Sequence, residues 1–315
     1  MDRFLHLEAL ELPQDFSPTH FELPVSVIDL THPALPHQVR SQLLSMQYYG
    51  QYLQDGLNTG HLNLNQHGMA TFYSKVNLST YLGYAFEAYV VRKLNEGGAN
   101  NKLKRNAIMW CSHRSQPDQK WIDEWTAIGT GLKETQLVHP MFYITTDTSD
   151  VRFVRTVKSK KSGIRNVEPL TLLENKMPAG IQIKAITGNE QTEIINPLRS
   201  KKYSCVLTML RRQNGHWFHS HDACMQLLKN MHYQGLIGQE EREQLERKIY
   251  RPSQLGFDEK DVNEYAEYIR FHFPNFHIPD ASLVATANIE IGRSWIGRQT
   301  FVSTDALTKN IIIEE

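Results

Sequence analysis

One apolar segment that carries two polar side chains constrains the fold more than any other part of the chain. Residues 180–186 read Gly-Ile-Gln-Ile-Lys-Ala-Ile, which has the length and composition of a β-strand. Successive side chains on a strand point to opposite faces, so Gln182 and Lys184 share one face and the isoleucines beside them share the other. A lysine in so apolar a strand is unfavourable unless its ammonium group has a partner or a task. We therefore expect Lys184 to have a specific role.

Glu87 is the second unusual position, because it lies within an apolar helix. A helix is expected from Ser79 to about Leu94, ending at two glycines. Its buried stripe has helical spacing and consists of Leu82, Ala85, Phe86, Tyr89 and Val90. Glu87 lies one position from this stripe, at its edge. A glutamate there is either a solvated side chain or a functional group.

The remaining hydrophobic pattern predicts a mixture of helices and strands. Strands are expected at 25–28, 141–146, 151–157, 168–173, 180–186 and 203–210, with a turn at 147–150. Helices are expected at 38–57, 119–134, 192–198, 222–234, 239–249 and 258–272, followed by short mixed elements over 281–315. The expected fold class is α/β, with a central mixed sheet flanked by helices and a mostly helical C-terminal extension.

A chain of 315 residues is long enough for one large or two modest domains. Prolines punctuate the first forty residues, so 1–78 is interpreted as a partly helical N-terminal lead-in. Residues 79–212 are expected to form the core. Residues 213–315 are expected to form a mainly helical domain for recognition or assembly.

The composition is that of an ordinary globular protein, with 40% apolar and 22% charged residues. The 34 basic and 34 acidic residues balance, which weakens an interpretation as a nucleic-acid-binding protein without excluding it. Three cysteines without a CxxC motif argue against a disulfide framework. The chain has no apolar run of about 18 residues and no basic, apolar leader at its start. A cytoplasmic location with no membrane partner is expected.

The polar residues suit the hydrolysis of a phosphodiester. This reaction needs oxygen ligands for a divalent cation, an activated water and stabilisation of negative charge. The candidates are Glu87, Glu168, Gln182, Lys184 and the backbone carbonyl of Ile183.

The middle acid of this set has several candidates. Glu168 is favoured because the fourteen residues that separate it from Gln182 suit a strand, a turn and a second strand. Glu174 falls in that turn, and Asp147 and Asp150 lie farther back along the chain. These three acids remain alternatives.

On these residues, the chain resembles the restriction-endonuclease-like PD-(D/E)xK nuclease superfamily. It is most similar to the branch whose last motif is Gln-x-Lys, as in Mrr-type restriction nucleases and several antiphage effector nucleases. The family core is a helix with a glutamate, a three-strand meander, a helix and a further strand, and residues 79–210 match that order. The resemblance assigns Glu87 to the helix glutamate, and Gln182 and Lys184 to the final motif. The chain departs from the family at the middle acid, which is normally an aspartate.

The resemblance implies a Mg²⁺- or Mn²⁺-dependent endonuclease that cuts DNA in restriction or antiphage defence. Glu87, Glu168 and the Ile183 carbonyl would hold the metal, Gln182 would orient the site, and Lys184 would activate water. Double-strand cutting would suit a homodimer or a partner in a defence complex. The alternatives are a nuclease acting on RNA and a noncatalytic nucleic-acid-binding or interaction protein on a degenerate nuclease scaffold.

A run of positive charge supports a polyanionic partner. Six basic residues and no acid lie within 151–166, namely Arg152, Arg155, Lys158, Lys160, Lys161 and Arg165. Such a run suits the phosphate backbone of DNA, because each neutralised phosphate releases counterions. The competing interpretation is a solvated, lysine-rich loop.

Overall fold

The computed structural model describes most of the chain between residues 37 and 272. The described residues are 4–6, 22–24, 37–64, 70–72, 76–96, 101–145, 147–158, 165–209, 211–213 and 216–272. The strand expected at 25–28 and the elements expected at 281–315 lie outside them. The chain divides into two compact units, one of Met1–Leu78 with Asn263–Glu315 and one of Ser79–Val262. All the candidate site residues belong to the second unit.

Among its described residues, the first unit has two antiparallel strand pairs, a long helix and the later part of a second helix. The strands β1 (Phe4–His6) and β2 (Glu22–Pro24) pair antiparallel, as do β3 (Leu62–Leu64) and β4 (Ala70–Phe72). Helix α1 (His37–Thr59) covers the helix expected at 38–57. The unit boundary falls inside α10 (Glu259–His272), whose Glu264 and Tyr265 form buried hydrogen bonds with Tyr48 and Asp55 of α1.

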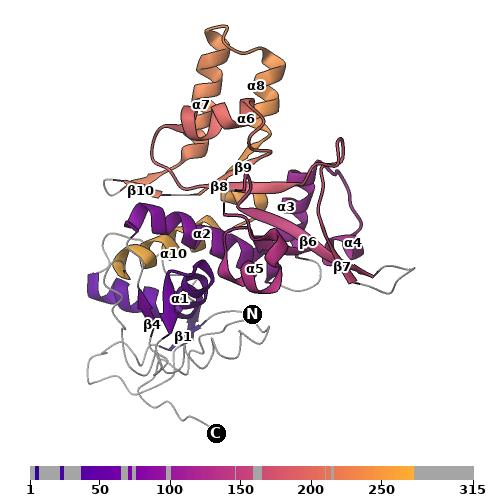
Figure 1. The fold of residues 1–315 in the computed structure, drawn as a ribbon. Helices are drawn as coiled ribbons and strands as arrows, with labels where there is room; N and C mark the ends of the chain where they lie inside the picture. The colour runs from indigo at the N-terminus through magenta and orange to yellow at the C-terminus, as the bar shows by residue number, and fades with distance from the viewer. Residues whose placement is uncertain are drawn as a thin grey trace, which may run out of the picture. The chain divides into compact units, whose positions relative to one another are not determined.

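The second unit is built on a mixed sheet with helices around it (Figure 1). Its main strands are β5 (Thr126–Gly129), β6 (Val151–Lys158), β8 (Gly180–Lys184), β9 (Val206–Thr208) and β12 (Ile249–Tyr250). They follow the order β5-β6-β8-β9-β12 across the sheet. The pairs β5–β6 and β6–β8 are antiparallel, whereas β8–β9 and β9–β12 are parallel. This arrangement confirms the expected α/β class.

A sixth strand, β7 (Arg165–Pro169), forms a hairpin with the second half of β6. Strand β8 pairs with the first residues of β6, through Val151 and Arg152. Since β5 occupies the opposite edge of β6, β7 and β8 follow one another along the same edge. The chain leaves the sheet between them, where Thr171 and Pro178 form an isolated bridge. Consequently β7 and β8 do not pair with each other.

Three expected elements differ from the structure. The strand expected at 168–173 is instead β7 (Arg165–Pro169), and the chain leaves the sheet after it, at the isolated bridge between Thr171 and Pro178. The helix expected at 119–134 is instead the short helix α4 (Gln119–Asp123), the strand β5 and the helix α5 (Lys133–Val138). Tertiary contacts favour the strand here, because the side-chain amide of Asn95 forms two hydrogen bonds with the backbone of Ala127 on the free edge of β5. The strand expected at 141–146 begins with a 3₁₀ turn, η3 (Pro140–Phe142).

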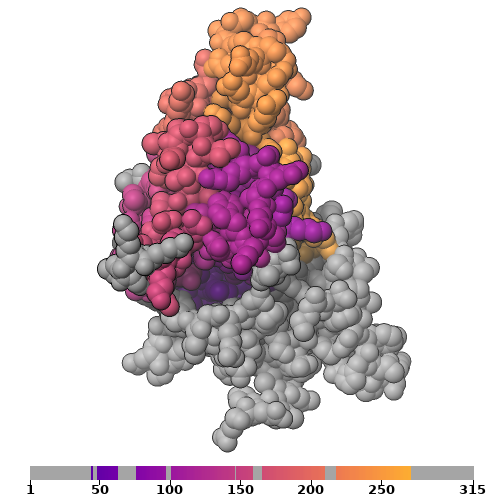
Figure 2. Space-filling view, turned by 90° about the vertical axis from the view of Figure 1, so that its right-hand side faces the viewer, coloured from indigo at the N-terminus to yellow at the C-terminus, as the bar shows by residue number. Residues whose placement is uncertain are grey.

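Helices cover the sheet. Helix α2 (Leu78–Asn95) carries Glu87 and follows the expected bounds closely. Helix α3 (Lys102–Ser112) contacts β8 and stacks Trp110 on Tyr250 of β12. At its C-terminal end, the Ser112 carbonyl accepts a hydrogen bond from Leu173. Figure 2 shows α3 (purple) sharing one face of this unit with the strands that follow it in sequence (pink).

The segment after β9 completes the same unit. It contains β10 (Arg211–Gln213), β11 (His216–Phe218), α7 (Ser220–Tyr233), α8 (Gln239–Glu246), β12 and α9 (Pro252–Leu255). The helices α7 and α8 form a hairpin on the β9 side of the sheet (Figure 1). Because β12 pairs with β9, residues 213–262 are part of the sheet unit, whereas a separate helical domain was expected from residue 213.

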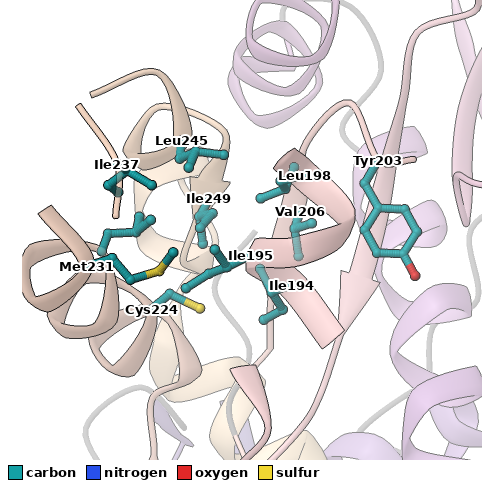
Figure 3. Close-up of a cluster of buried hydrophobic side chains, with 11 residues drawn as sticks. Ile194, Ile195, Leu198, Tyr203, Val206, Cys224, Met231, Ile237, Leu245 and Ile249 are labelled. Carbon is teal, nitrogen blue, oxygen red and sulfur yellow. The ribbon is translucent and has the colours of Figure 1, made fainter. Parts of the chain in front are cut away.

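An apolar cluster joins this helical hairpin to the sheet. It unites the π-helical turn η4 (Gln191–Ile195) and α6 (Asn196–Arg199) with the strands β9 and β12 and with α7 and α8. Figure 3 shows Ile194, Ile195 and Leu198 reaching toward Met231 and Ile249. All these side chains are buried. In the described part of the chain, none of the helices is both long enough and apolar enough to cross a membrane.

Candidate metal centre

The site forms where β6 begins and β8 ends. Asp150 immediately precedes β6, and its backbone N–H donates to the Ile181 carbonyl at 3.0 Å. Its Oδ2 accepts hydrogen bonds from Gln182 Nε2 at 2.5 Å and from the Ile183 N–H at 2.7 Å. One carboxylate oxygen therefore connects the start of β6 to both the side chain and the backbone of β8.

Close approach of the two strands depends on Gly180. A Cβ at this position would lie 2.5 Å from the Ser149 side chain and 2.9 Å from the Val151 carbonyl oxygen. Any larger residue would have to push the strands apart, and Asp150 lies between those two neighbours in sequence. The glycine thus permits the contact between Asp150 and Gln182.

The parallel ladder leaves the backbone of Ile183 available to the site. Gln182 N–H donates to Cys205, and the Lys184 carbonyl accepts from Met209, so both residues bond toward β9. Backbone groups of alternate residues point to opposite edges of a strand, so the N–H and C=O of Ile183 point toward Asp150. Since β6 begins at Val151, no strand pairs with Ile183 on that edge in the described structure. Its carbonyl is in the position of a potential metal ligand.

Gln182 contributes an oxygen that lacks a protein partner. Its side chain is 8% exposed, and its amide nitrogen faces the Asp150 carboxylate. The opposite orientation would place two oxygen acceptors against each other. Among the described residues, no group donates to the buried Oε1 atom. Because an unsatisfied buried acceptor is unfavourable, this oxygen suits water or a cation.

Glu87 brings a second carboxylate from α2. A Cβ on Gly131, just after β5, would lie 3.8 Å from Glu87 Oε2. Burial raises the pKa of Glu87 well above its usual value, and the negative charge of Asp150 raises it further, while Lys184 opposes both effects. Burial also raises the pKa of Asp150 to about 6, although the Ile183 N–H, Lys184 and Gln182 favour its charged form. Two part-buried carboxylates whose pKa values are raised, one of them by the charge of the other, form a place for a cation.

Lys184 interacts with this pair and also with a third acid, Glu193. Its side chain is 18% exposed, and its Nζ lies 3.4 Å from Oε2 of Glu193 on the π-helical turn η4. The same ammonium group lies 5.4 Å from the centre of the Tyr203 ring. This lysine therefore has an acidic partner, Glu193, which was not among the candidates.

Glu168 does not join the site, contrary to expectation. It is on β7, 50% exposed, and its carboxylate lies 3.4 Å from Arg155. It pairs with Arg155, five residues along β6 from Asp150, or about 16 Å at the usual rise of a strand. The physical reason is the sheet register: β7 pairs with the distal half of β6 and not with β8.

Of the alternative middle acids, only Asp150 contacts the Gln-x-Lys strand. Glu174 forms an exposed ion pair with His113. Asp147 forms an ion pair of 2.7 Å with Arg152. Asp150 was detectable as an aspartate directly before a strand of alternating apolar residues, but its pairing with β8 depends on contacts distant in sequence.

The expected basic run is partly neutralised. Arg152 pairs with Asp147, and Arg155 lies between Glu124 and Glu168. Lys158 and Arg165 are exposed and face each other at the far end of the β6–β7 hairpin. The other two residues of the run, Lys160 and Lys161, lie outside the described residues. The charge nearest the site is therefore already engaged with acids.

The donor set fits a hard divalent cation. Mg²⁺ and Mn²⁺ prefer oxygen ligands, and the site offers the Glu87 and Asp150 carboxylates with the Ile183 carbonyl and Gln182 Oε1. In the part of the chain that the structure describes, no three His, Cys, Asp or Glu side chains gather in a way that could hold a metal ion. A third protein ligand would accordingly be a carbonyl oxygen.

Comparison with known proteins leaves the site to be interpreted from its own geometry. No family model, no curated protein and no solved structure matches the chain.

Proposed function

We propose that the chain is a Mg²⁺- or Mn²⁺-dependent endonuclease with a restriction-endonuclease-like core, and that it hydrolyses phosphodiester bonds in DNA. The observation that carries this proposal is the junction of Asp150 with Gln182 and Ile183, next to Glu87 and Lys184. The order of elements also supports it. A helix with a glutamate, three antiparallel strands, a helical segment and a parallel strand correspond to α2, β5, β6, β8, η4–α6 and β9.

The proposed roles follow from the position of each group. Glu87, Asp150 and the Ile183 carbonyl would hold the cation, which when bound supplies Lewis-acid stabilisation of the phosphate and a more acidic water. Gln182 holds the Asp150 carboxylate through its amide N–H. Lys184 would donate hydrogen bonds to the attacking water or to a phosphate oxygen and so offset the negative charge of the transition state.

We further propose a role in restriction or antiphage defence, acting on DNA in the cytoplasm. This part rests on the resemblance of the Gln-x-Lys motif to defence nucleases. A homodimer or a complex with another defence protein would bring two such sites to the two strands of a duplex.

A noncatalytic nucleic-acid-binding or interaction protein is the second candidate. The observation that favours it is the small acidic set. Glu168 is exposed and paired with Arg155, and among the described residues no three His, Cys, Asp or Glu side chains gather in a way that could hold a metal ion. Such a protein would bind DNA or another partner without metal-dependent hydrolysis.

Cleavage of supercoiled plasmid DNA with and without Mg²⁺ separates the two candidates. The nuclease is expected to nick or linearise the plasmid only with the metal, and Lys184→Met is expected to slow cleavage by about a hundredfold while DNA binding persists. Lys229→Met on α7 is the matched control, because this lysine is exposed and lies outside the basic run.

Full cleavage by Lys184→Met would remove the assigned site. The absence of metal-dependent cleavage by the unmodified protein would favour the noncatalytic candidate. Faster cleavage of a single-stranded RNA than of the plasmid would show that the substrate of this site is RNA.

A further inference from the structure

Glu193 belongs to the surroundings of the site, although neither its sequence position nor the resemblance assigns it a role. It lies on the π-helical turn η4, where single π turns are frequent at functional sites. Its neighbours Ile194 and Ile195 are fully buried in the apolar cluster, while Glu193 itself is 48% exposed. The backbone N–H of Glu193 is also bonded to the Asn189 carbonyl. The carboxylate is thus presented from a firmly anchored backbone.

Three acids attract Lys184. Glu193 Oε2 lies 3.4 Å from its ammonium group. The same positive charge also lowers the pKa of Glu87 and of Asp150. A lysine that moved fully onto Glu87 and Asp150 would neutralise the two groups that a cation needs.

We propose, resting on the function proposed above, that Glu193 is a positioning residue that holds the Lys184 ammonium group away from Glu87 and Asp150. The two carboxylates then remain available to a divalent cation, while the lysine stays at the edge of the site. Tyr203 supports this position, since the ammonium group also lies over its ring. Without Glu193, Glu87 and Asp150 remain as acids that attract Lys184.

The test is a double-mutant cycle read out by cation affinity. The full chain is titrated with Ca²⁺ in the absence of DNA, by calorimetry and by the shift in melting temperature, as wild type, Glu193→Gln, Lys184→Met and the double variant. Glu193→Gln is expected to weaken Ca²⁺ binding about fivefold, the factor for a part-exposed ion pair near the upper end of its range. In the Lys184→Met background the same change is expected to have no effect, because the competing ammonium group is gone.

Glu241→Gln on α8 is the matched control. Glu241 is 42% exposed and pairs with Arg199 at 2.8 Å, so the change removes a comparable ion pair outside the site. It is expected to leave Ca²⁺ affinity unchanged. The cleavage assay adds a second readout, in which Glu193→Gln lowers kcat with little change in KM for DNA.

Equal weakening in both backgrounds would overturn the proposal, because Glu193 would then act on the cation directly. An unchanged affinity of Glu193→Gln in the wild-type background would overturn it as well. If the wild-type protein bound no Ca²⁺, both this inference and the metal-dependent nuclease would fail. Loss of the coupling with intact metal-dependent cleavage would refute the inference alone.

Discussion

An acid lies at each end of β6, but the surroundings of the two acids, Asp150 and Glu168, differ. At the start of the strand, Asp150 is half-buried, bonded to the side chain and backbone of β8, and has its pKa raised by burial. In its distal half, Arg155 meets Glu124 and Glu168 at the exposed surface. An acid therefore becomes a candidate metal ligand because it contacts the strand of the Gln-x-Lys motif and is shielded from water. Its distance from that motif along the sequence does not decide this.

The largest expected effect separates Asp150 from Glu168. Asp150→Ala is expected to reduce Mg²⁺-dependent plasmid cleavage about a thousandfold, because it removes a carboxylate from the centre that stabilises the transition state. Glu168→Ala is the control at the other end of β6. Its cleavage rate is expected to stay within about twofold of the wild-type rate, since the ion pair that it removes is exposed. Cleavage rates at saturating Mg²⁺ measure the effect of each substitution. Equal losses of cleavage rate in the two variants would contradict the assignment of Asp150, and not Glu168, to the site.

The next largest effect concerns stability. Truncating a side chain is expected to destabilise the fold more at the site end of β6 than at its distal end. Phe153 is fully buried beside the site end of β6, whereas Val157 in the distal half is only half-buried. Phe153→Ala is expected to lower the free energy of unfolding by about 3–4 kcal/mol, and Val157→Ala by about 1 kcal/mol. Urea denaturation of both variants checks this, and a Val157 variant as unstable as the Phe153 variant would contradict the comparison.

A smaller effect of opposite sign is expected from the buried carboxylates. In the folded, metal-free protein Glu87 and Asp150 bind protons more tightly than in the unfolded chain, because burial raises both pKa values. Their contribution to stability is therefore fully present below about pH 4 and declines as the pH rises through the folded pKa values, about 6 for Asp150. Glu87→Gln is expected to raise the free energy of unfolding at pH 7.5 by about 1 kcal/mol and to flatten this decline.

Thermal melts between pH 4.5 and 8 without metal test that expectation, and added Ca²⁺ provides the control. The cation is expected to stabilise the wild type more than Glu87→Gln. If Glu87→Gln is less stable than wild type at pH 7.5 without metal, Glu87 stabilises the folded protein, which would contradict this prediction.

The smallest effect is expected at the exposed end. Glu168→Gln breaks the pair with Arg155 but leaves Arg155 its bond of 2.9 Å to Glu124. The free energy of unfolding is expected to change by less than about 0.5 kcal/mol, and 1 M NaCl is expected to reduce the difference further. A change in the free energy of unfolding above about 1.5 kcal/mol would contradict this prediction, because an exposed ion pair does not contribute that much.

Local pattern was sufficient for much of the fold. The alternation of 180–186 and 151–157 identified β8 and β6, and helical spacing identified α1, α2, α7 and α10. It failed at 119–134, where Trp121, Trp125 and Ile128 mimic a helical face. There, the strand β5 is selected by its pairing with β6 and by the Asn95 amide, both of which come from distant residues.

The residues of the candidate site divide in the same way. Glu87, Gln182 and Lys184 stand out in the linear chain because each is a charged or polar group in an apolar element, and the energetic cost of that placement is local. The choice of Asp150 over Glu168, and the presence of Glu193, follow from strand register and from the turn that packs on the sheet. Register is set by long-range pairing and by the close approach at Gly180. The choice of Asp150 among the candidate acids, and the part of Glu193, could therefore be decided only once the chain was folded.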